Sequence, residues 1–343
     1  MNTIGYELKI ASFGESHGAC IGIVIDGCPP GLRVSPEELQ NEMDARKAQL
    51  LLHTSRREKD EVEILSGVFE DRTTGAPILC LIENHDFDSS RYESFRTTPR
   101  PSHADFTRHF KYHEFADHRG GGRFSGRITA GFVAAGYFAR RILGDEVKVK
   151  AYVREVGGKS LENDSDIAKR IEELKGDSLG GIVECIAHNL PIGLGEPVFD
   201  TVEGEIAKAI FSIPGVKGIE FGAGFAFAEM KGSQANDGFC LREGKVETET
   251  NNAGGILGGI TNGMPLIFRV VIKPTPSISL PQKSVDLKEM KSKEIRIEGR
   301  HDPCIVLRAA PVVEAVACIV LADLYLRHVR GIGFEEERIK RKD

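Results

Sequence analysis

The sequence predicts an α+β fold, with antiparallel sheets and helices layered around a large core. The chain has 343 residues, of which 41% are hydrophobic and 28% charged, as in ordinary globular proteins. Strand-like and helix-like segments follow one another without the strict alternation of a doubly wound parallel sheet. The segment 127–143 is apolar around most of its circumference, which predicts a helix packed on several sides.

The first expected elements are a helix and two strands. Ser35 is placed to cap a helix over 36–52, because a proline suits the first helical position and two glutamates suit the first turn. Strand-like composition occurs at 61–68 and 77–83, and the turn-rich residues 73–75 separate these segments. The two strands should therefore form a hairpin-like pair.

The rest of the chain adds three strands and three helices. β-branched runs predict strands, and amphipathic or apolar periodicity predicts helices. The strands cover 147–153, 181–187 and 265–272, and the helices cover 164–174, 200–211 and 309–330. The apolar segment 312–326 contains Glu314 and Asp323, which predicts a buried helix and not a membrane span.

Charge and cysteine content exclude several classes of protein. With 45 lysines and arginines against 51 acidic residues, the formal charge of −6 gives no overall attraction to nucleic acid or membrane lipid. Charged residues interrupt the first twenty positions, so no secretory signal is predicted. The seven cysteines lack C-x-x-C spacing, which predicts reduced thiols in a cytoplasmic protein and no zinc ribbon.

A local basic stretch over 100–127 differs from this acidic background. It carries six arginines and lysines against three acidic residues, together with four histidines. Arginine has forked donors that match phosphate and carboxylate oxygens. The glycines at 120–122, followed by a helix, would add backbone amides and the positive end of a helix dipole. We therefore predict an anion-binding site in this stretch.

The same stretch has other interpretations. It could be a solvated basic surface whose histidines cap turns. It could also serve an RNA-binding or assembly protein, because Phe106, Phe110, Tyr112 and Phe115 alternate with the cations, although such proteins are usually basic overall. A metal site is not predicted, since the histidine spacing does not match patterns such as H-E-x-x-H.

Two further segments bring reactive side chains together. Residues 12–18 place Ser16 and His17 between glycines, which predicts a loop presenting His17 and not a core histidine. Residues 299–304 place an arginine, a histidine and an aspartate in succession, although alone this pattern could be a turn. P-loop and dinucleotide-binding glycine patterns are absent. These features indicate an enzyme that acts on a multiply anionic small molecule.

Six motifs, in this order along the chain, resemble the signatures of the chorismate synthase family. They are Phe13–Gly18, Arg100–Asp105, Arg119–Arg127, Asn252–Ile260, Lys273–Ser277 and Gly299–Cys304. The likeness extends from residue 2 to about 330, so we expect one catalytic domain over 1–330 and a charged tail over 331–343. Because so many motifs occur in the family's order, the resemblance is highly specific.

The resemblance implies a reaction, a fold and an assembly. The reaction is the 1,4-anti elimination of phosphate from 5-enolpyruvylshikimate 3-phosphate to give chorismate, in the shikimate pathway of aromatic amino acid biosynthesis. It requires reduced FMN (FMNH2) with no net redox change. The implied fold is a β-α-β sandwich, and the implied assembly is a homotetramer. No reductase domain is visible, so an external flavin reductase would supply the reduced cofactor, with NADPH involved only indirectly, if at all.

The resemblance also implies catalytic roles at matching positions. His17 would protonate the departing phosphate, since an imidazolium can neutralise leaving-group charge near pH 7. His103 would lie beside the reduced flavin and supply or hold a proton there. Asp302 would act through flavin N5 as the base that ultimately receives the substrate proton. Ser16 and Ser125 would relay protons or orient these groups.

Binding residues are implied in the same way. A substrate with a phosphate and two carboxylates needs several cations, for which the matching residues are Arg46, Arg100, Arg127 and Arg300, with Arg123 as a further candidate. The matching flavin contacts are Arg123, Phe124, Ser125, Pro214, Gly215, Gly258, Lys273, Pro274, Thr275, Pro276, Ser277 and Arg300. Glycine allows the main chain to approach the isoalloxazine, and Lys273 offers it a charge.

The sequence departs from the family pattern in the segment to which NADPH contacts are attributed. The family's arginine-rich stretch is replaced by Asp-Ala-Arg-Lys-Ala-Gln at 44–49, which leaves Arg46 as the implied contact there. A phosphomonoesterase without flavin is a further enzymatic alternative. Its product would carry a free hydroxyl, whereas the lyase product gains a second ring double bond.

Overall fold

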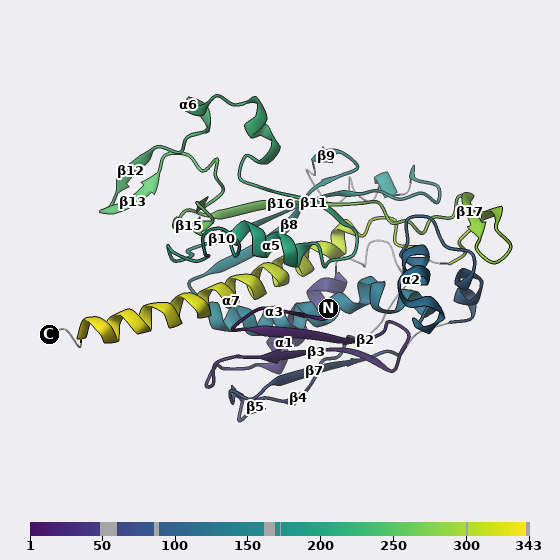
Figure 1. Ribbon diagram of the computed structural model, residues 1–343, viewed down its shortest axis with the longest axis horizontal. Helices are drawn as coiled ribbons and strands as arrows, with labels where there is room; N and C mark the ends of the chain where they lie inside the picture. The colour runs from purple at the N-terminus through teal and green to yellow at the C-terminus, as the bar shows by residue number, and fades with distance from the viewer. Residues whose placement is uncertain (49–59, 86–88, 161–168, 172, 300, 341–343) are drawn as a thin grey trace.

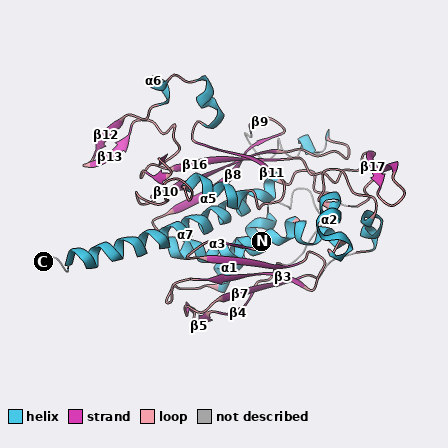
Figure 2. Ribbon diagram, viewed as in Figure 1, coloured by secondary structure: helices cyan, strands magenta, loops and turns pink. Residues whose placement is uncertain are grey.

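Two five-stranded sheets enclose a layer of helices (Figure 1). The computed structural model describes the chain except residues 49–59, 86–88, 161–168, 172, 300 and 341–343. The strand orders are β1-β2-β3-β7-β4 and β11-β16-β10-β8-β9, and all neighbouring strands are antiparallel. Figure 2 shows the long helices α3 (Thr129–Leu143) and α7 (Val306–Lys340) between the two sheets. The predicted α+β class and β-α-β sandwich are confirmed.

Separate two-stranded hairpins accompany the two five-stranded sheets. The first sheet contains β1 (Thr3–Ile4), β2 (Lys9–Gly14), β3 (Cys20–Asp26), β7 (Ile78–Glu83) and β4 (Glu63–Ser66). The second contains β11 (Val216–Phe221), β16 (Leu266–Ile272), β10 (Gly181–His188), β8 (Lys148–Val156) and β9 (Lys159–Ser160). The hairpins are β5 (Val68–Phe69) with β6 (Arg72–Thr73), β12 (Phe239–Arg242) with β13 (Lys245–Thr248), β14 (Ile256–Leu257) with β15 (Ile260–Thr261), and β17 (Gln282–Asp286) with β18 (Lys291–Ile295).

The helical elements are α-helices and shorter 3-10 turns. The α-helices are α1 (Pro36–Ala48), α2 (Asp105–Tyr112), α3 (Thr129–Leu143), α5 (Val202–Ile210), α6 (Gly232–Ala235) and α7 (Val306–Lys340). The 3-10 turns are η1 (Ser90–Arg96), η2 (His113–Phe115), η3 (Arg119–Phe124), η4 (Gly126–Ile128) and η5 (Gly224–Glu229).

The crossing of α3 and α7 forms the centre of the sandwich. Helix α3 packs on α7 and on β3, whereas α7 packs on β8 and β10 of the other sheet. A Cβ atom at Gly136 of α3 would lie 2.5 Å from the Cβ of Ala315 in α7, so the absent side chain permits this close crossing. Nearly the whole circumference of α3 is buried, as its apolar sequence predicts.

The early elements agree with the sequence predictions. The backbone amide of Glu38 donates to Ser35 Oγ at 3.2 Å, so Ser35 caps α1 as predicted. Strands β4 and β7 pair antiparallel, with the β5–β6 hairpin inserted between them in the chain. The later predicted strands and the helices at 127–143 and 200–211 also form. Most of the helix predicted at 164–174 lies outside the described residues.

Helix α7 is long and apolar enough to cross a membrane by length and composition. The most apolar 18-residue window within Val306–Gly331 has a mean hydropathy of 1.9, but 78% of that window is buried inside the protein. This burial confirms the prediction of a core helix. The helix continues to Lys340, so part of the predicted tail is helical, and Figure 1 shows this end projecting from the body. All seven cysteines are free thiols, as predicted.

Candidate active site

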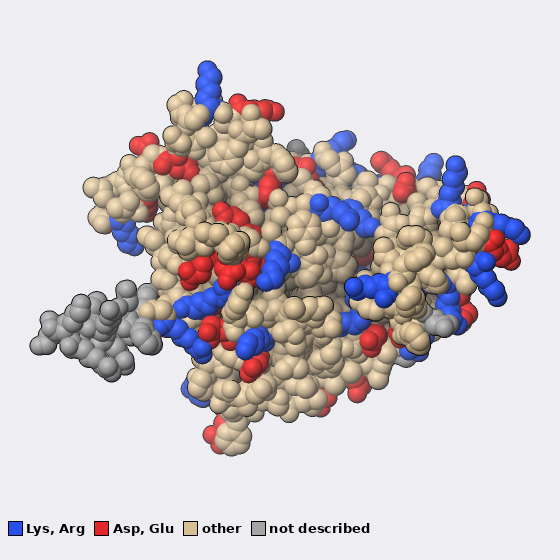
Figure 3. All heavy atoms as spheres, in the orientation of Figure 1, with Lys and Arg blue, Asp and Glu red and all other residues tan. Residues whose placement is uncertain are grey.

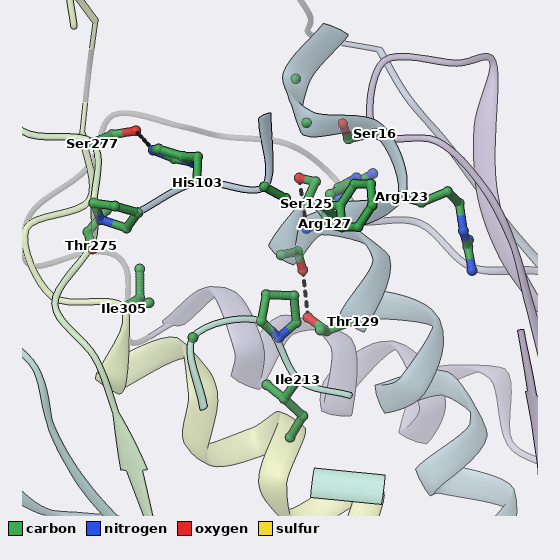
Figure 4. A pocket seen from close by; sticks show the side chains of 18 of the residues that line it. Ser16, His103, Arg123, Ser125, Arg127, Thr129, Ile213, Thr275, Ser277 and Ile305 are labelled. Atoms are coloured by element: carbon green, nitrogen blue, oxygen red, sulfur yellow. Dashed lines mark hydrogen bonds between the residues drawn. The ribbon is translucent and has the colours of Figure 1, made fainter. Parts of the chain in front are cut away.

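A cavity of about 600 Å³ lies between the loops of the first sheet, α2, the start of α3 and the start of α7. Its lining includes predicted residues from four of the six motifs, together with Arg46, Pro214 and Gly215. From those motifs it contains Ser16, His17, Arg100, His103, Arg123, Phe124, Ser125, Arg127, Lys273, Thr275, Pro276 and Ser277. In Figure 4, His103, Thr275 and Ser277 lie on one side, and Ser16, Ser125 and Arg127 lie across from them.

His17 is more enclosed than its loop position suggested. The loop between β2 and β3 does present it to the cavity, but only 6% of the residue is exposed. Its Nδ1 lies 3.0 Å from Ser89 Oγ, and its ring makes an edge contact with Tyr92 of η1. The loop therefore presents His17 as predicted, but the residue is buried, because Ser89 and Tyr92 cover the ring.

Two cavity arginines share one buried carboxylate. Arg46 Nη1 donates to Asp60 Oδ2 at 2.9 Å, and Arg127 Nη1 pairs with the other oxygen of the same aspartate. Asn84 supports the group, since its Oδ1 accepts from Arg127 Nε at 3.1 Å while its amide donates to the carbonyls of Glu15 and Gly18. Arg46 and Arg127 thus bring two guanidinium groups to this wall of the cavity, which favours an anionic ligand.

Asp105, at the start of α2, forms ion pairs with two arginines, Arg100 and Arg108. Arg100 donates to both oxygens of Asp105, at 2.7 and 3.0 Å, and its guanidinium lies over the rings of Tyr92 and Phe95. Burial alone would raise the pKa of Asp105, but the hydrogen bonds and charge of Arg100 outweigh it and hold that pKa below its usual value. This aspartate is therefore ionised at neutral pH.

His103 lies between that pair and the loop after β16. Its Nε2 is 2.8 Å from Ser277 Oγ, a contact drawn in Figure 4. Burial, followed by the positive charge of Arg100, lowers the pKa of His103 to about 4. Lys273 Nζ donates to the carbonyl of Ser102 at 2.7 Å, and burial lowers its pKa below the ordinary lysine value. His103 is thus neutral at pH 7 in the ligand-free protein.

The comparisons with known proteins agree with the motifs. The chorismate synthase family model matches residues 8–326. The chorismate synthase of Dehalococcoides mccartyi (strain BAV1) is 53% identical over 95% of this chain and 97% of its own. That of Thermococcus kodakarensis is 50% identical over 94% and 97%, respectively. This chain belongs to the chorismate synthase family. A crystal structure of a chorismate synthase aligns with a TM-score of 0.75 and 30% identity, covering 95% of this chain and 93% of that one.

Members of the chorismate synthase family are lyases of aromatic biosynthesis, and the family uses a flavin. The cavity fits such a cofactor, because its volume lies within the 300 to 1,000 Å³ usual for ligand sites. One wall is apolar and includes Ile213, Pro214 and Ile305. The buried Oγ1 of Thr275 lines the same cavity and has no hydrogen-bond partner among the described residues. An apolar wall beside a buried hydroxyl group suits a flat, partly polar ring system.

Three of the predicted site residues do not line the cavity, and a fourth lies outside the described residues. Asp302 lies behind the wall, where it accepts from the Cys304 amide at 3.0 Å and pairs at 3.5 Å with the cavity residue Arg308. Pro274 and Gly258 do not line the cavity, and Gly258 forms the turn between β14 and β15. Arg300 lies outside the described residues.

Arg123 lines the cavity, but its guanidinium points elsewhere. It donates to Asn2 Oδ1 at 3.0 Å, to the Gly14 carbonyl at 3.0 Å and to Ser12, and Figure 4 shows the group directed away from the other labelled side chains. In this conformation it anchors η3 to strand β2. A direct flavin contact by this guanidinium would require these bonds to break.

The basic stretch does not form the nucleic-acid surface considered from the sequence. Arg100 and Arg108 are buried, and Arg119 is paired with Asp117. On the face shown in Figure 3, lysines and arginines are interspersed with acidic residues. No group of His, Cys, Asp and Glu side chains that could hold a metal occurs among the described residues. Arg100, Arg108 and Arg127 instead line the cavity.

Sequence reasoning missed the residues that hold the named ones. Asp60 joins two arginines from distant segments, Asn84 connects the His17 loop to Arg127, and Ser89 contacts His17. None of the three belongs to a motif that the sequence analysis singled out. The sequence offered one chemical signal for them. Several arginines gathered in one site require a carboxylate nearby.

Proposed function

We propose that this protein eliminates phosphate from 5-enolpyruvylshikimate 3-phosphate in a 1,4-anti sense and forms chorismate with reduced FMN bound in the cavity. The observation that carries this proposal is the convergence of four sequence motifs on one cavity that combines arginine pairs, two histidines and an apolar wall. A polyanionic substrate and a flat cofactor need this combination of positive charge and apolar surface.

The arginine clusters support binding and orientation of the substrate. Arg46 and Arg127 share Asp60, whereas Arg100 is held by Asp105, so their guanidinium planes are fixed before a ligand arrives. Fixed, forked donors bind carboxylate or phosphate oxygens with little loss of side-chain freedom. We assign Arg300 to the substrate as well, from the motif alone.

His17 is the proposed acid for the leaving group. In the elimination, the bond from a ring carbon to the phosphate oxygen breaks and the phosphate leaves with the electron pair. A ring C–H bond breaks at the other end of the allylic system, and its electron pair completes the new double bond. His17 supplies a proton to the departing phosphate, and the contact with Ser89 orients the imidazole for this transfer. Ser16, which precedes His17 in the same loop, orients neighbouring groups.

The residues around 214 and 273–277 are the proposed flavin contacts. Reduced FMN, when bound, supplies electron density to the reaction and recovers it by the end. The peptide around Gly215, the loop at Lys273–Ser277, Phe124 and Ser125 would hold it, with Gly258 and Arg300 assigned from their motifs. His103 holds one proton on its neutral ring beside Ser277. Asp302 is the proposed final acceptor of the ring proton.

We also propose a homotetramer in the cytoplasm, with one catalytic domain over 1–330. Both sheets contribute to one continuous hydrophobic core, which supports a single catalytic body. Large apolar side chains such as Phe199 and Phe225 are 88% and 85% exposed, which supports burial between subunits. An external reductase would supply reduced FMN, and NADPH would act only indirectly.

The deciding experiment is an anaerobic assay with the purified full chain. Dithionite-reduced FMN and the enolpyruvyl ester should give chorismate, followed by its absorbance, together with one equivalent of phosphate. Oxidised FMN should give no product. Equal rates with both forms of FMN would remove the flavin from the mechanism. Release of phosphate with a free ring hydroxyl would identify a phosphomonoesterase instead.

A further inference from the structure

Arg108 is a buried cavity residue to which no role has been given above. It lies on α2, lines the cavity and is only 5% exposed. Its Nη1 is buried and has no hydrogen-bond partner among the residues that the structure describes. A buried cationic donor without an acceptor is unfavourable, so native proteins rarely keep one without a reason.

The neighbouring carboxylates do not satisfy this guanidinium. Arg108 Nη2 lies 3.9 Å from Asp105 Oδ1, beyond hydrogen-bonding distance, whereas both oxygens of that aspartate accept from Arg100. Asp117, the other acidic group that influences Arg108, accepts two side-chain hydrogen bonds from Arg119. Among the described residues, Arg108 therefore keeps one buried donor without an acceptor, and it shares the charge of Asp105 with Arg100.

Local charge indicates which ligand group would use this capacity. Around His103 and Asp105 lie the cations Arg100, Arg108 and Lys273, with Asp105 as the carboxylate. This region is thus two positive charges in excess, since His103 is neutral. A phosphate monoester carries nearly two negative charges at pH 7.

We propose that Arg108 is a further phosphate-binding residue of this cavity and donates to the phosphate monoester of a bound ligand. The inference rests on the proposed function only in naming the ligands, which are FMN and the enolpyruvyl ester. Both carry this group, so the chemistry alone does not choose between them. Arg108 would fix the position of one of the two molecules without touching the bonds that react.

The test compares ligands with and without the phosphate. Affinities of wild type, Arg108→Gln and Arg108→Lys are measured by calorimetry for FMN against riboflavin, and for the enolpyruvyl ester against its dephosphorylated form. Inorganic phosphate is a third probe, followed by its effect on Tm. Arg96→Gln is the matched control, because Arg96 is exposed, pairs with Glu93 and lies outside the cavity.

We expect Arg108→Gln to weaken one phosphate-bearing ligand by roughly 10- to 100-fold, the range for a charge-assisted hydrogen bond. Its phosphate-free counterpart should bind as in wild type. The ligand that loses affinity identifies the source of the phosphate. Arg108→Lys should recover part of the loss, and the Tm increase with inorganic phosphate should shrink in Arg108→Gln. Arg96→Gln should match wild type in every arm.

Two results would overturn the assignment. Unchanged affinity for both phosphate ligands in Arg108→Gln would show that the guanidinium binds neither. Equal weakening of phosphate-bearing and phosphate-free ligands would show that Arg108 only supports the fold, and Arg108→Lys repeats this comparison if the glutamine variant does not fold. Failure of the proposed function looks different, since wild type would then form no chorismate, while the inorganic phosphate arm would still test Arg108.

Discussion

His17 and Gly120 are in such close contact that no side chain fits between them. A Cβ atom at Gly120 would lie 2.0 Å from Cδ2 and 2.3 Å from Nε2 of the His17 ring, and 2.7 Å from Ser16 Oγ. Gly120 also has a φ of 59°, the first of three successive glycines with positive φ. The triple glycine therefore gives the imidazole its space, in addition to shaping the turn that the sequence suggested.

Replacing Gly120 by alanine should displace His17 and reduce turnover. Gly121 is a matched control, because it has a φ of 88° but its Cβ would approach no atom closer than 3.8 Å. Both alanine variants should lose about 1 kcal/mol of stability from the left-handed backbone. Only Gly120→Ala should lower kcat by more than about tenfold, as expected when a catalytic group is misplaced. Equal kcat losses in the two variants would refute the steric argument.

Removing the imidazole itself tests the proposed acid. His17→Ala should fold and bind flavin nearly as wild type does, with kcat lower by on the order of a hundredfold or more. Ser89→Ala should have a smaller effect, because it removes only the contact that orients Nδ1. Steady-state chorismate formation measures both variants, and circular dichroism checks their folding. Full activity in His17→Ala would eliminate the assignment.

The sequence predicted which residues belong to the site better than it predicted how their side chains pair with one another. Ser16, Arg100, Ser125 and Lys273 come from four motifs, and the cavity brings them together as the motif resemblance implied. The motifs contain the charged and reactive side chains, so they identify the residues that belong to the site. They do not determine where Arg123 points, because that depends on carbonyls of β2 that accept its hydrogen bonds.

The missed features share one physical reason. The pairing of Asp60 with Arg127 and the enclosure of His17 by Ser89 are contacts between segments distant in sequence. The lowered pKa of His103 results first from burial, which also depends on how such segments pack. Local composition carries no signal for such contacts. Helices and strands were more accessible to prediction, since caps and periodicity are local, as Ser35 at the start of α1 shows.

Asp60 should be a strong determinant of stability. It is 2% exposed and pairs with both Arg46 and Arg127, so Asp60→Asn removes one buried negative charge from beside two guanidinium groups. We expect a loss of roughly 3 to 5 kcal/mol in the free energy of unfolding, as for other broken buried ion pairs. Urea denaturation measures it. Glu93→Gln, which removes an exposed carboxylate that pairs with Arg96 and His118, should shift the midpoint far less. Similar midpoints for Asp60→Asn and wild type would contradict the shared-carboxylate interpretation.

The lowered pKa of His103 should make folding stability depend on pH between about 4 and 6.5. In this window the unfolded chain, with an ordinary histidine pKa near 6.5, binds a proton that folded His103, with a pKa of about 4, does not. Stability should therefore be fully present above pH 6.5 and fall as the pH drops to 4. The full difference corresponds to roughly 3 kcal/mol, since each pKa unit is about 1.4 kcal/mol.

His103→Gln isolates this contribution, because other titrating groups act equally in both proteins. The difference in unfolding free energy between wild type and variant, measured by urea denaturation from pH 4 to 7.5, should shift in favour of the variant as the pH falls. His85→Gln is the control, since His85 is exposed and pairs only with Glu83 among the described contacts, so its curve should follow wild type. A constant difference between wild type and His103→Gln across this range would mean that His103 keeps an ordinary pKa. It would then be available at neutral pH as a protonated imidazole, and the neutral ring assigned to it beside Ser277 would be wrong.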